Sequence, residues 1–326
     1  MSAPTSEKIV TVIGGSGFIG RHIVRALAKR GYRIRVACRR PDLAGHVQPL
    51  GTPGQIMPVQ ANVRYPASLA AACDGAFAVI NLTGVLVSSR SQSFDAVHVY
   101  GAEASARGAK TAKASVFIQM SALGADTSSA SEYARSKAAG ETKAKAAFPG
   151  AIILRPSIVF GPEDNFFNQF AGLSRLTPAL PLIGGGSTKF TPLFVGDLAE
   201  AISALIDAGE ATGKTYELGG PEVFTFKQLM EFTLETIGRK RLLVPVPWPV
   251  AKIMGSIMGM LPYAPLTADQ VELLKTDNVV SEAATREGRD LAGLGVSGHS
   301  IQSIVPSYLY RYRKAGQFTV PKGISK

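Results

Sequence analysis

The segment from Ile9 to Arg40 constrains the fold more than any other part of the chain. It begins with an apolar, β-branched run (Ile9–Ile13), passes through a glycine-rich turn (Gly14–Gly20), continues with a helical apolar stripe and ends in a second strand, Arg33–Cys38. A strand, a glycine turn, a helix and a second strand in this order are typical of a βαβ unit whose helix start faces a pyrophosphate. The segment therefore predicts a parallel sheet with a dinucleotide at its edge.

The glycines of the turn have separate predicted roles. Gly14 allows a tight reversal, Gly17 lets backbone approach the phosphates, and Gly20 lets the helix lie close to the sheet. The Gly-x-x-Gly-x-x-Gly spacing differs slightly from Gly-x-Gly-x-x-Gly. An ordinary glycine-rich turn is the alternative, but the flanking strand and helix favour a nucleotide site. The residues predicted to bind the cofactor here are Gly14, Ser16, Gly17, Phe18, Ile19 and Gly20.

The end of the second strand predicts which nucleotide is bound. An NAD site usually has an acidic residue there for the ribose hydroxyls, whereas this chain has Arg39 and Arg40. Planar guanidinium groups pair well with the oxygens of a 2′-phosphate. The alternative is a pair of solvated surface arginines. We predict NADPH (NADP) as the cofactor, held by Arg39 and Arg40.

Composition and charge limit the classes of binding partner and metal that the chain is expected to have. The net charge is +11 at pH 7, yet the cations are dispersed and no nucleic-acid motif is present, so a membrane surface or a protein partner is favoured. Cys38 and Cys73 form no metal-ligand pattern, and the four histidines lack acidic or cysteine companions, so we expect no metal. Met1–Lys8 is too polar for a signal peptide, and the protein is expected to stay where it is made.

Strands and helices alternate through the first half of the chain, which predicts an α/β, Rossmann-type doubly wound parallel sheet. The second half is less regular and predicts a smaller C-terminal lobe, partly interleaved with the sheet. We expect domains at 1–160 and 161–326. The expected elements after the first two strands are strands at 55–60, 76–81, 116–120, 151–155 and 215–218, and helices at 94–112, 131–148, 166–174, 195–208 and 225–237, the last opened by a capping box. Ligands bind beyond the carboxyl ends of such strands, where Asn62, Leu82, Thr83, Gly84 and Ser121 are expected.

Tyr133 and Lys137 are spaced to share one face of the long helix. A nearby ammonium favours the phenolate, so Tyr133 could exchange a proton with a carbonyl or alcohol. Ser121, at the end of the fifth strand, could hold the substrate oxygen. Ser121, Tyr133 and Lys137 are therefore the candidate catalytic residues, although a Tyr-x-x-x-Lys pair also occurs by chance.

Together with the glycine turn, three further motifs resemble the extended and atypical short-chain dehydrogenase/reductase superfamily: Tyr133–Lys137, Leu154–Pro156 with Val159–Pro162, and Phe194–Asp197. The resemblance covers residues 8–235. It implies that Ser121, Tyr133 and Lys137 occupy the catalytic positions and that Lys137 touches the nicotinamide ribose. It also places Pro156 and Ile158 beside the nicotinamide, and Asn62 and Val63 near the adenine. His98 stands where relatives often carry Asn, which weakens the case for an active reductase.

A narrower resemblance spans nearly the whole chain. The sequence is similar to the nucleotide-binding accessory subunits of respiratory complex I (NADH:ubiquinone oxidoreductase). The segments that carry this similarity are 133–141, 148–153, 160–168, 244–249, 262–267 and 270–272. The resemblance implies tightly held NADPH without known turnover and partners among the other complex I subunits. It also implies a peripheral position on the cytoplasmic face of a bacterial inner membrane, or on the matrix side in an organelle.

The segment 242–266 is apolar, with Lys252 as its charged residue. Its prolines limit any helix to Pro249–Met260, about 17 Å long, against roughly 30 Å of hydrocarbon, so it is not expected to span a membrane. It is either buried in the lobe, a wall of a substrate pocket, or an interface to the membrane or a partner, and the resemblance favours the interface. The aromatic and basic run Tyr308–Lys314 would suit lipid headgroups.

Two functions remain open at this point. The first is a structural or regulatory complex I subunit with built-in NADPH, a non-catalytic use of the fold. The second is a freestanding NADP-dependent reductase, epimerase or dehydratase that uses Tyr133 and Lys137. The apolar second half disfavours a sugar-nucleotide substrate, and the sequence identifies neither a substrate nor an oligomeric state.

Overall fold

The computed structural model describes residues 7–89, 92–260 and 266–314. The chain divides into two compact units, each assembled from three separate segments. The first unit consists of Met1–Pro156, Val195–Leu218 and Val280–Ser297, and the second of Ser157–Phe194, Gly219–Val279 and Gly298–Lys326. Two stretches of the expected C-terminal domain thus belong to the first unit, because a strand and a helix in 195–218 complete its sheet.

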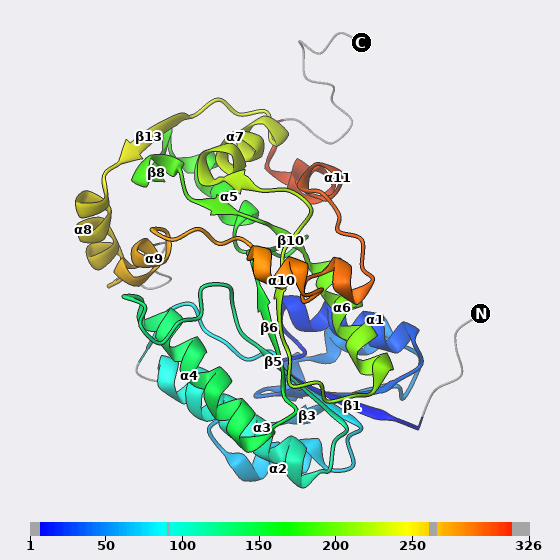
Figure 1. Cartoon of the computed structure of the whole chain (residues 1–326). Helices are drawn as coiled ribbons and strands as arrows, with labels where there is room; N and C mark the ends of the chain where they lie inside the picture. The colour runs from blue at the N-terminus through cyan, green and yellow to red at the C-terminus, as the bar shows by residue number, and fades with distance from the viewer. Residues whose placement is uncertain (1–6, 90–91, 261–265, 315–326) are drawn as a thin grey trace. The chain divides into compact units, whose positions relative to one another are not determined.

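The first unit is built on a parallel sheet. Within the described residues the sheet has 7 strands in the order β11-β6-β5-β4-β1-β2-β3 (Figure 1). They are β1 (Ile9–Ile13), β2 (Arg33–Cys38), β3 (Ile56–Gln60), β4 (Ala78–Asn81), β5 (Val116–Met120), β6 (Ile152–Pro156) and β11 (Thr215–Leu218). The strand order reverses between β1 and β4, where a ligand crevice is expected in a doubly wound sheet. The predicted Rossmann-type fold is confirmed.

Helices cover both faces of this sheet. Helices α1 (Phe18–Lys29) and α6 (Val195–Ala208) pack against each other on one face. Helices α2 (Pro66–Cys73), α3 (Gly101–Thr111) and α4 (Glu132–Ala147) lie together on the other (Figure 1). Short turns η1 (Pro41–Leu43), η2 (Gly45–Leu50), α10 (Glu282–Arg286) and η5 (Ala292–Leu294) complete the unit. Helix α1 forms because its apolar residues recur at helical spacing, and Ile23, Val24 and Leu27 are fully buried.

The helix expected over 94–112 is not a uniform α-helix. It begins as a π-helix, η3 (Asp95–Tyr100), and continues as α3. Helix α4 packs closely beside it, because a Cβ on Gly140 would lie 2.1 Å from the backbone oxygen of His98. Such π-segments are frequent at functional sites, and this one carries His98.

The second unit is organised around an aromatic core instead of a large sheet. Phe160, Phe167, Phe190 and Phe226 are buried in it. Its strands are β7 (Val159–Phe160), β8 (Ala179–Ile183), β9 (Lys189–Phe190), β10 (Leu193–Phe194), β12 (Phe224–Thr225) and β13 (Leu242–Val246). Its helices and turns are α5 (Phe167–Leu176), η4 (Gly184–Gly186), α7 (Phe226–Thr236), α8 (Trp248–Met258), α9 (Ala268–Leu273), α11 (Ile301–Ile304), α12 (Pro306–Leu309) and η6 (Tyr310–Tyr312). The predicted capping box of Thr225 and Gln228 opens α7.

The apolar segment 242–266 forms β13 and α8, and its residues 261–265 lie outside the described part of the chain. Strand β13 pairs in parallel with β8. Helix α8 places its small residues inward: Ala251 and Gly255 are buried, and a Cβ on Gly255 would lie 2.8 Å from the backbone nitrogen of Ala268. Three of its aliphatic residues point outward, with Val250, Ile253 and Ile257 exposed by 53%, 62% and 63%, whereas Trp248 and Met254 pack against the buried cluster that includes Ala251.

The aromatic and basic run 308–314 is used mainly inside the second unit. The Tyr308 hydroxyl donates a 2.5 Å hydrogen bond to the Asp164 carboxylate, and burial raises the pKa of both groups. Arg311 donates to the Asn168 side chain, and Arg313 to the Thr236 carbonyl. The expectation that this run faces lipid headgroups is therefore not supported for Tyr308, because the carboxyl-terminal helices fold back over α5 and draw this tyrosine into the core.

Candidate functional site

The glycine turn between β1 and α1 has the geometry of a phosphate-binding turn. Gly14 adopts φ +82° and donates its N–H to the Ala37 carbonyl on β2. A Cβ on Gly20 would lie 2.5 Å from the Gly15 Cα, so α1 can approach the turn this closely with glycine alone. Gly17 is the N-cap of α1, and no side chain caps the helix, so the N–H groups of its first turn remain available to an anion. The turn therefore fits a dinucleotide pyrophosphate.

The end of β2 distinguishes the two arginines. Arg40 is exposed and holds the Asp42 carboxylate at 2.7 Å. Arg39 is also exposed and forms no hydrogen bond or ion pair within the described residues. Next to them, the backbone carbonyl of Ser16 lies 3.2 Å from the His46 ring. Arg39 is thus the better placed of the two to pair with a phosphate.

The residues predicted around the adenine and at the end of β4 are fixed by local hydrogen bonds. The Asn62 side chain accepts the Arg64 N–H, and Val63 is buried against Gly101. Leu82 donates its N–H to the Ile13 carbonyl, which ties the end of β4 to β1. The Thr83 hydroxyl donates to the Asn81 carboxamide at 2.6 Å. These contacts fix the chain that follows β3 and β4 at the carboxyl ends of the strands.

Tyr133 and Lys137 lie on one face of α4, and the Lys137 Nζ is 5.7 Å from the centre of the Tyr133 ring. A Cβ on Gly84 would lie 3.1 Å from this Nζ, so the chain after β4 passes directly beside the ammonium. The ammonium also donates to the Met120 carbonyl at 3.5 Å. Burial lowers the pKa of Lys137 to about 8, while the charge of Glu141 opposes the shift.

His98 connects α4 to the chain after β4. Its Nε2 accepts the Val85 N–H at 3.0 Å, so the ring proton resides on Nδ1 and is donated to the Ser136 hydroxyl at 2.8 Å. The Ser136 hydroxyl donates to the Tyr133 carbonyl. Burial, together with the Lys137 charge, lowers the pKa of His98 to about 3. His98 is therefore a neutral linker that holds the Tyr133 turn against Val85.

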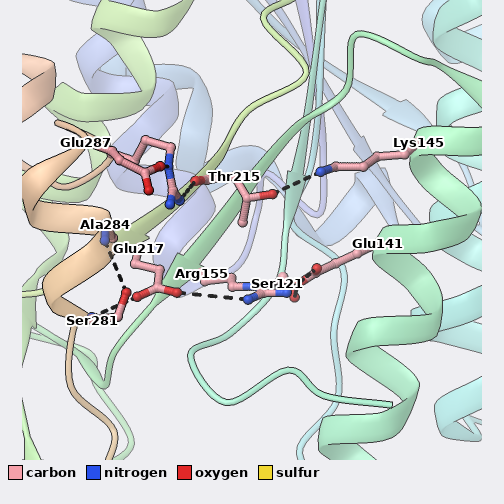
Figure 2. A network of polar contacts seen from close by, with 10 residues as sticks. Ser121, Glu141, Lys145, Arg155, Thr215, Glu217, Ser281, Ala284 and Glu287 are labelled. Carbon is pink, nitrogen blue, oxygen red and sulfur yellow. Dashed lines mark hydrogen bonds and ion pairs between the residues drawn. The ribbon is translucent and has the colours of Figure 1, made fainter.

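Ser121 is engaged by the protein itself. Its hydroxyl donates a 2.5 Å hydrogen bond to Oε1 of Glu141 on α4, and both residues are buried (Figure 2). The Arg155 guanidinium on β6 donates two hydrogen bonds to the same carboxylate, of 2.9 and 2.7 Å. A carboxylate that accepts three hydrogen bonds in a buried site is strongly held. The Ser121 hydroxyl therefore points at Glu141, which the sequence did not single out.

The network around Glu141 continues across the first unit. Arg155 lies 4.0 Å from the Glu217 carboxylate on β11, and Glu217 accepts the Ser281 N–H at 2.9 Å (Figure 2). Nearby, Lys145 and Arg289 both contact Thr215. The network thus joins α4, β6 and β11 to the late segment 280–297.

The last two predicted residues fall in different units. Pro156 ends β6 in the first unit, and its carbonyl accepts the Leu123 N–H. Ile158 belongs to the second unit, where it packs against the aromatic core. Glu141, Arg155 and Ser136 were missed, although Glu141 follows Lys137 by four residues and so had to share its helix face.

Comparison with known proteins identifies the family. The chain is 37% identical to the mitochondrial NADH dehydrogenase [ubiquinone] 1 alpha subcomplex subunit 9 of Arabidopsis thaliana, over 94% of this chain and 79% of that protein. It is 31% identical to a ceramide reductase of Caulobacter vibrioides, over 88% of this chain and 90% of that protein. The structure of DesIV, a dTDP-glucose 4,6-dehydratase of Streptomyces venezuelae with NAD and TYD bound, superposes with a TM-score of 0.69 at 20% identity, covering 93% of this chain and 96% of that one.

These relatives confirm the predicted resemblance to complex I accessory subunits and to extended short-chain dehydrogenases/reductases. The model of the NAD dependent epimerase/dehydratase family matches residues 10–219, which include the glycine turn, Ser121, Tyr133 and Lys137. By this match and by its fold, the chain belongs to the NAD dependent epimerase/dehydratase family.

Proposed function

We propose that this protein is an accessory subunit of respiratory complex I that holds a nicotinamide dinucleotide as a resident cofactor. The observation that carries the proposal is the similarity to the Arabidopsis subunit, which is 37% identical over 94% of the chain, against 31% over 88% for the Caulobacter reductase. The family model ends at residue 219, whereas that alignment covers 94% of the chain and therefore continues through the second unit. The second unit also carries α8, whose exposed aliphatic residues Val250, Ile253 and Ile257 offer a surface to a partner or a membrane.

The proposed cofactor is NADPH. The glycine turn and the uncapped start of α1 suit the pyrophosphate, and the exposed guanidinium of Arg39 suits a 2′-phosphate. The Tyr133 and Lys137 side chains would lie toward the nicotinamide ribose. The Ser121 hydroxyl, in contrast, is donated to Glu141 and would have to leave that carboxylate to hold a substrate oxygen. This arrangement favours a retained cofactor over rapid turnover.

The proposed membrane contact is peripheral and uses α8. None of the helices in the described ranges combines the length and apolar character needed to cross a bilayer. The outward residues Val250, Ile253 and Ile257 recur at the spacing of one helix face, as in helices that lie in a membrane interface. The contact would lie on the cytoplasmic face of a bacterial inner membrane, or on the matrix side in an organelle.

The assembly role is tested by affinity purification of the tagged full-length protein from its native membranes in mild detergent. We expect complex I subunits to co-purify, and to dissociate when Ile253→Asp and Ile257→Asp are combined if α8 contributes to attachment. Recovery of the unmodified protein without any complex I subunit would refute the proposal. The cofactor is tested separately by the thermal shift of the purified protein, which should be larger with NADPH than with NADH at equal concentration.

A freestanding reductase is the second candidate, favoured by the Tyr133–Lys137 geometry and by the named activity of the Caulobacter relative. In that case Tyr133 would donate the proton to a carbonyl oxygen as the cofactor supplies hydride. Oxidation of NADPH with an added long-chain carbonyl compound, abolished by Tyr133→Phe, would establish this alternative. Unchanged assembly of Tyr133→Phe with complex I and no turnover in either form would support the accessory role.

A further inference from the structure

A basic hollow of about 540 Å³ lies in the second unit, outside the nucleotide site. It is formed by α7, the turn η4 and β13. Leu182, Leu234 and Leu243 contribute apolar walls, and Lys227, Arg239, Lys240 and Arg241 contribute cations. We call this feature the basic hollow. Cations placed beside apolar walls are suited to an anionic group attached to an apolar body.

The cations of the basic hollow are barely neutralised by the protein. Lys227 approaches Glu231, which also lines the hollow, at 3.7 Å, and both side chains are more than half exposed, so this pair is weak. Arg239, Lys240 and Arg241 form no ion pair within the described residues. Four cations therefore share one carboxylate, and a bound anion would relieve their mutual repulsion.

Two of these cations are also held in place. The Arg239 Nε donates to the Tyr312 carbonyl at 3.1 Å, and the Arg241 Nε donates to the Ser174 carbonyl at 2.7 Å. Backbone carbonyls fix both side chains without cancelling their charge. A guanidinium that is already oriented loses less conformational entropy when it binds a phosphate.

We propose that the basic hollow binds the phosphate headgroup of an anionic phospholipid. The strand β13 that forms its wall leads directly into α8. Its residues Leu242 and Val244 are exposed by 70% and 45% and lie on the opposite face of the strand from Leu243 and Pro245, which line the hollow. Exposed aliphatic residues on the same strand fit a lipid in its bilayer better than a free phosphate compound. This inference rests on the proposed membrane contact of α8 and adds a specificity to it, because α8 alone would enter neutral and anionic bilayers alike.

The test measures binding of the full-length protein to phosphatidylcholine vesicles and to vesicles in which roughly one third of the lipid is phosphatidylglycerol. We expect affinity for the anionic vesicles to be greater by roughly tenfold or more, because several cations of the basic hollow would lie near the anionic surface. The double variant Lys227→Glu/Lys240→Glu should lose this preference. Among the residues that the structure describes, neither lysine donates a hydrogen bond to the backbone, so the fold should be retained, as checked by thermal unfolding.

A matched control distinguishes headgroup binding in the basic hollow from the general attraction of a cationic protein to an anionic membrane. Lys110→Glu/Lys143→Glu changes the net charge equally at exposed positions on α3 and α4 in the first unit. This variant should keep most of the preference for anionic vesicles. Equal losses in the two double variants, or equal binding of the unmodified protein to both kinds of vesicle, would overturn the proposed headgroup site.

Two further measurements separate this inference from the proposed membrane contact. Ile253→Asp/Ile257→Asp should weaken binding to both kinds of vesicle; binding to phosphatidylcholine without an anionic preference would refute the headgroup site and leave the α8 contact standing. Titration with inorganic phosphate should show no saturable binding in the low millimolar range. Saturable binding that Lys227→Glu/Lys240→Glu abolishes would reassign the hollow to a free phosphate compound.

Discussion

The two ends of the proposed cofactor site are prepared in opposite ways. At the glycine turn, the start of α1 has no side-chain cap and Arg39 has no partner within the described residues, so the donors there are available to a ligand. At the other end, the side chains of His98, Ser121 and Lys137 are all hydrogen-bonded to other groups of the protein. The end at the glycine turn, called the open end below, therefore offers free donors to an anion. At the other, called the closed end, these three side chains are already hydrogen-bonded within the protein. This contrast favours a protein that retains its nucleotide.

The largest expected effect probes the closed end through His98. Its pKa in the folded protein is about 3, against 6.5 for the ordinary group, so folding requires the neutral ring. Stability should fall as pH drops from 6.5 to 3, by up to about 5 kcal/mol in total, because the unfolded state binds the proton first. Denaturant unfolding between pH 7 and pH 4 should show a shallower loss for His98→Asn than for the unmodified protein. His22→Asn is the control; an identical pH dependence in all three would contradict the buried, neutral assignment.

The Glu141 carboxylate is expected to be the next most important group at the closed end. Glu141→Gln should destabilise the protein by about 3–5 kcal/mol, because Arg155 then loses its hydrogen-bonded carboxylate and keeps only the more distant Glu217, 4.0 Å away. Glu103→Gln removes a helix-surface pair with Arg107 and should cost at most about 0.5 kcal/mol. Urea midpoints of the two variants provide the comparison. Similar midpoints would mean that Glu141 does not hold the site together.

Lys137 supplies a test in the alkaline range. Its pKa is about 8 in the folded protein and 10.5 in the ordinary group, so the folded state releases its proton first as pH rises. The unmodified protein should gain about 3 kcal/mol of stability between pH 8 and 10.5 relative to Lys137→Met, which has no such proton. Parallel stability profiles for the two proteins would show that the Lys137 ammonium is not buried.

The smallest expected effect concerns the open end. Arg39→Ser should weaken NADPH binding roughly 30-fold, equivalent to about 2 kcal/mol for lost charge-assisted hydrogen bonds, with little effect on NADH. Arg40→Ser should have a smaller effect, because Arg40 already shares its charge with Asp42. Calorimetric titration with both nucleotides gives the four dissociation constants. A larger loss in Arg40→Ser would reverse the assignment of the 2′-phosphate partner.

The sequence was sufficient for features that depend on local pattern. The strands Ile9–Ile13 and Arg33–Cys38 and the helix Val195–Ala208 have the predicted bounds, since burial periodicity and turn residues define them. The capping box at Thr225 was equally predictable, because its two partners lie three residues apart. The strand predicted at 215–218 also has the bounds of β11.

Features that depend on distant side chains were not predictable in the same way. The direction of the Ser121 hydroxyl is decided by Glu141, twenty positions later, and by Arg155 on the adjoining strand. The π-helix η3, which carries His98, lies against α4 at Gly140, so this position involves a contact between two separate helices. Tyr308 begins an aromatic and basic run typical of membrane interfaces, yet its hydroxyl is buried and donates a hydrogen bond to Asp164. Each outcome is set by a tertiary contact that leaves no local signature.

The interleaving of the two units has a consequence for biosynthesis. Strand β6 gains its outer neighbour only when 215–218 has been made, and the Glu217 contact needs Ser281. A ribosome-bound nascent chain that stops near residue 160 would expose β6 as an unpaired edge and leave α1 uncovered by α6. The first unit can therefore complete its fold only after most of the second unit has emerged from the ribosome. Truncated fragments are expected to aggregate before they can bind the cofactor.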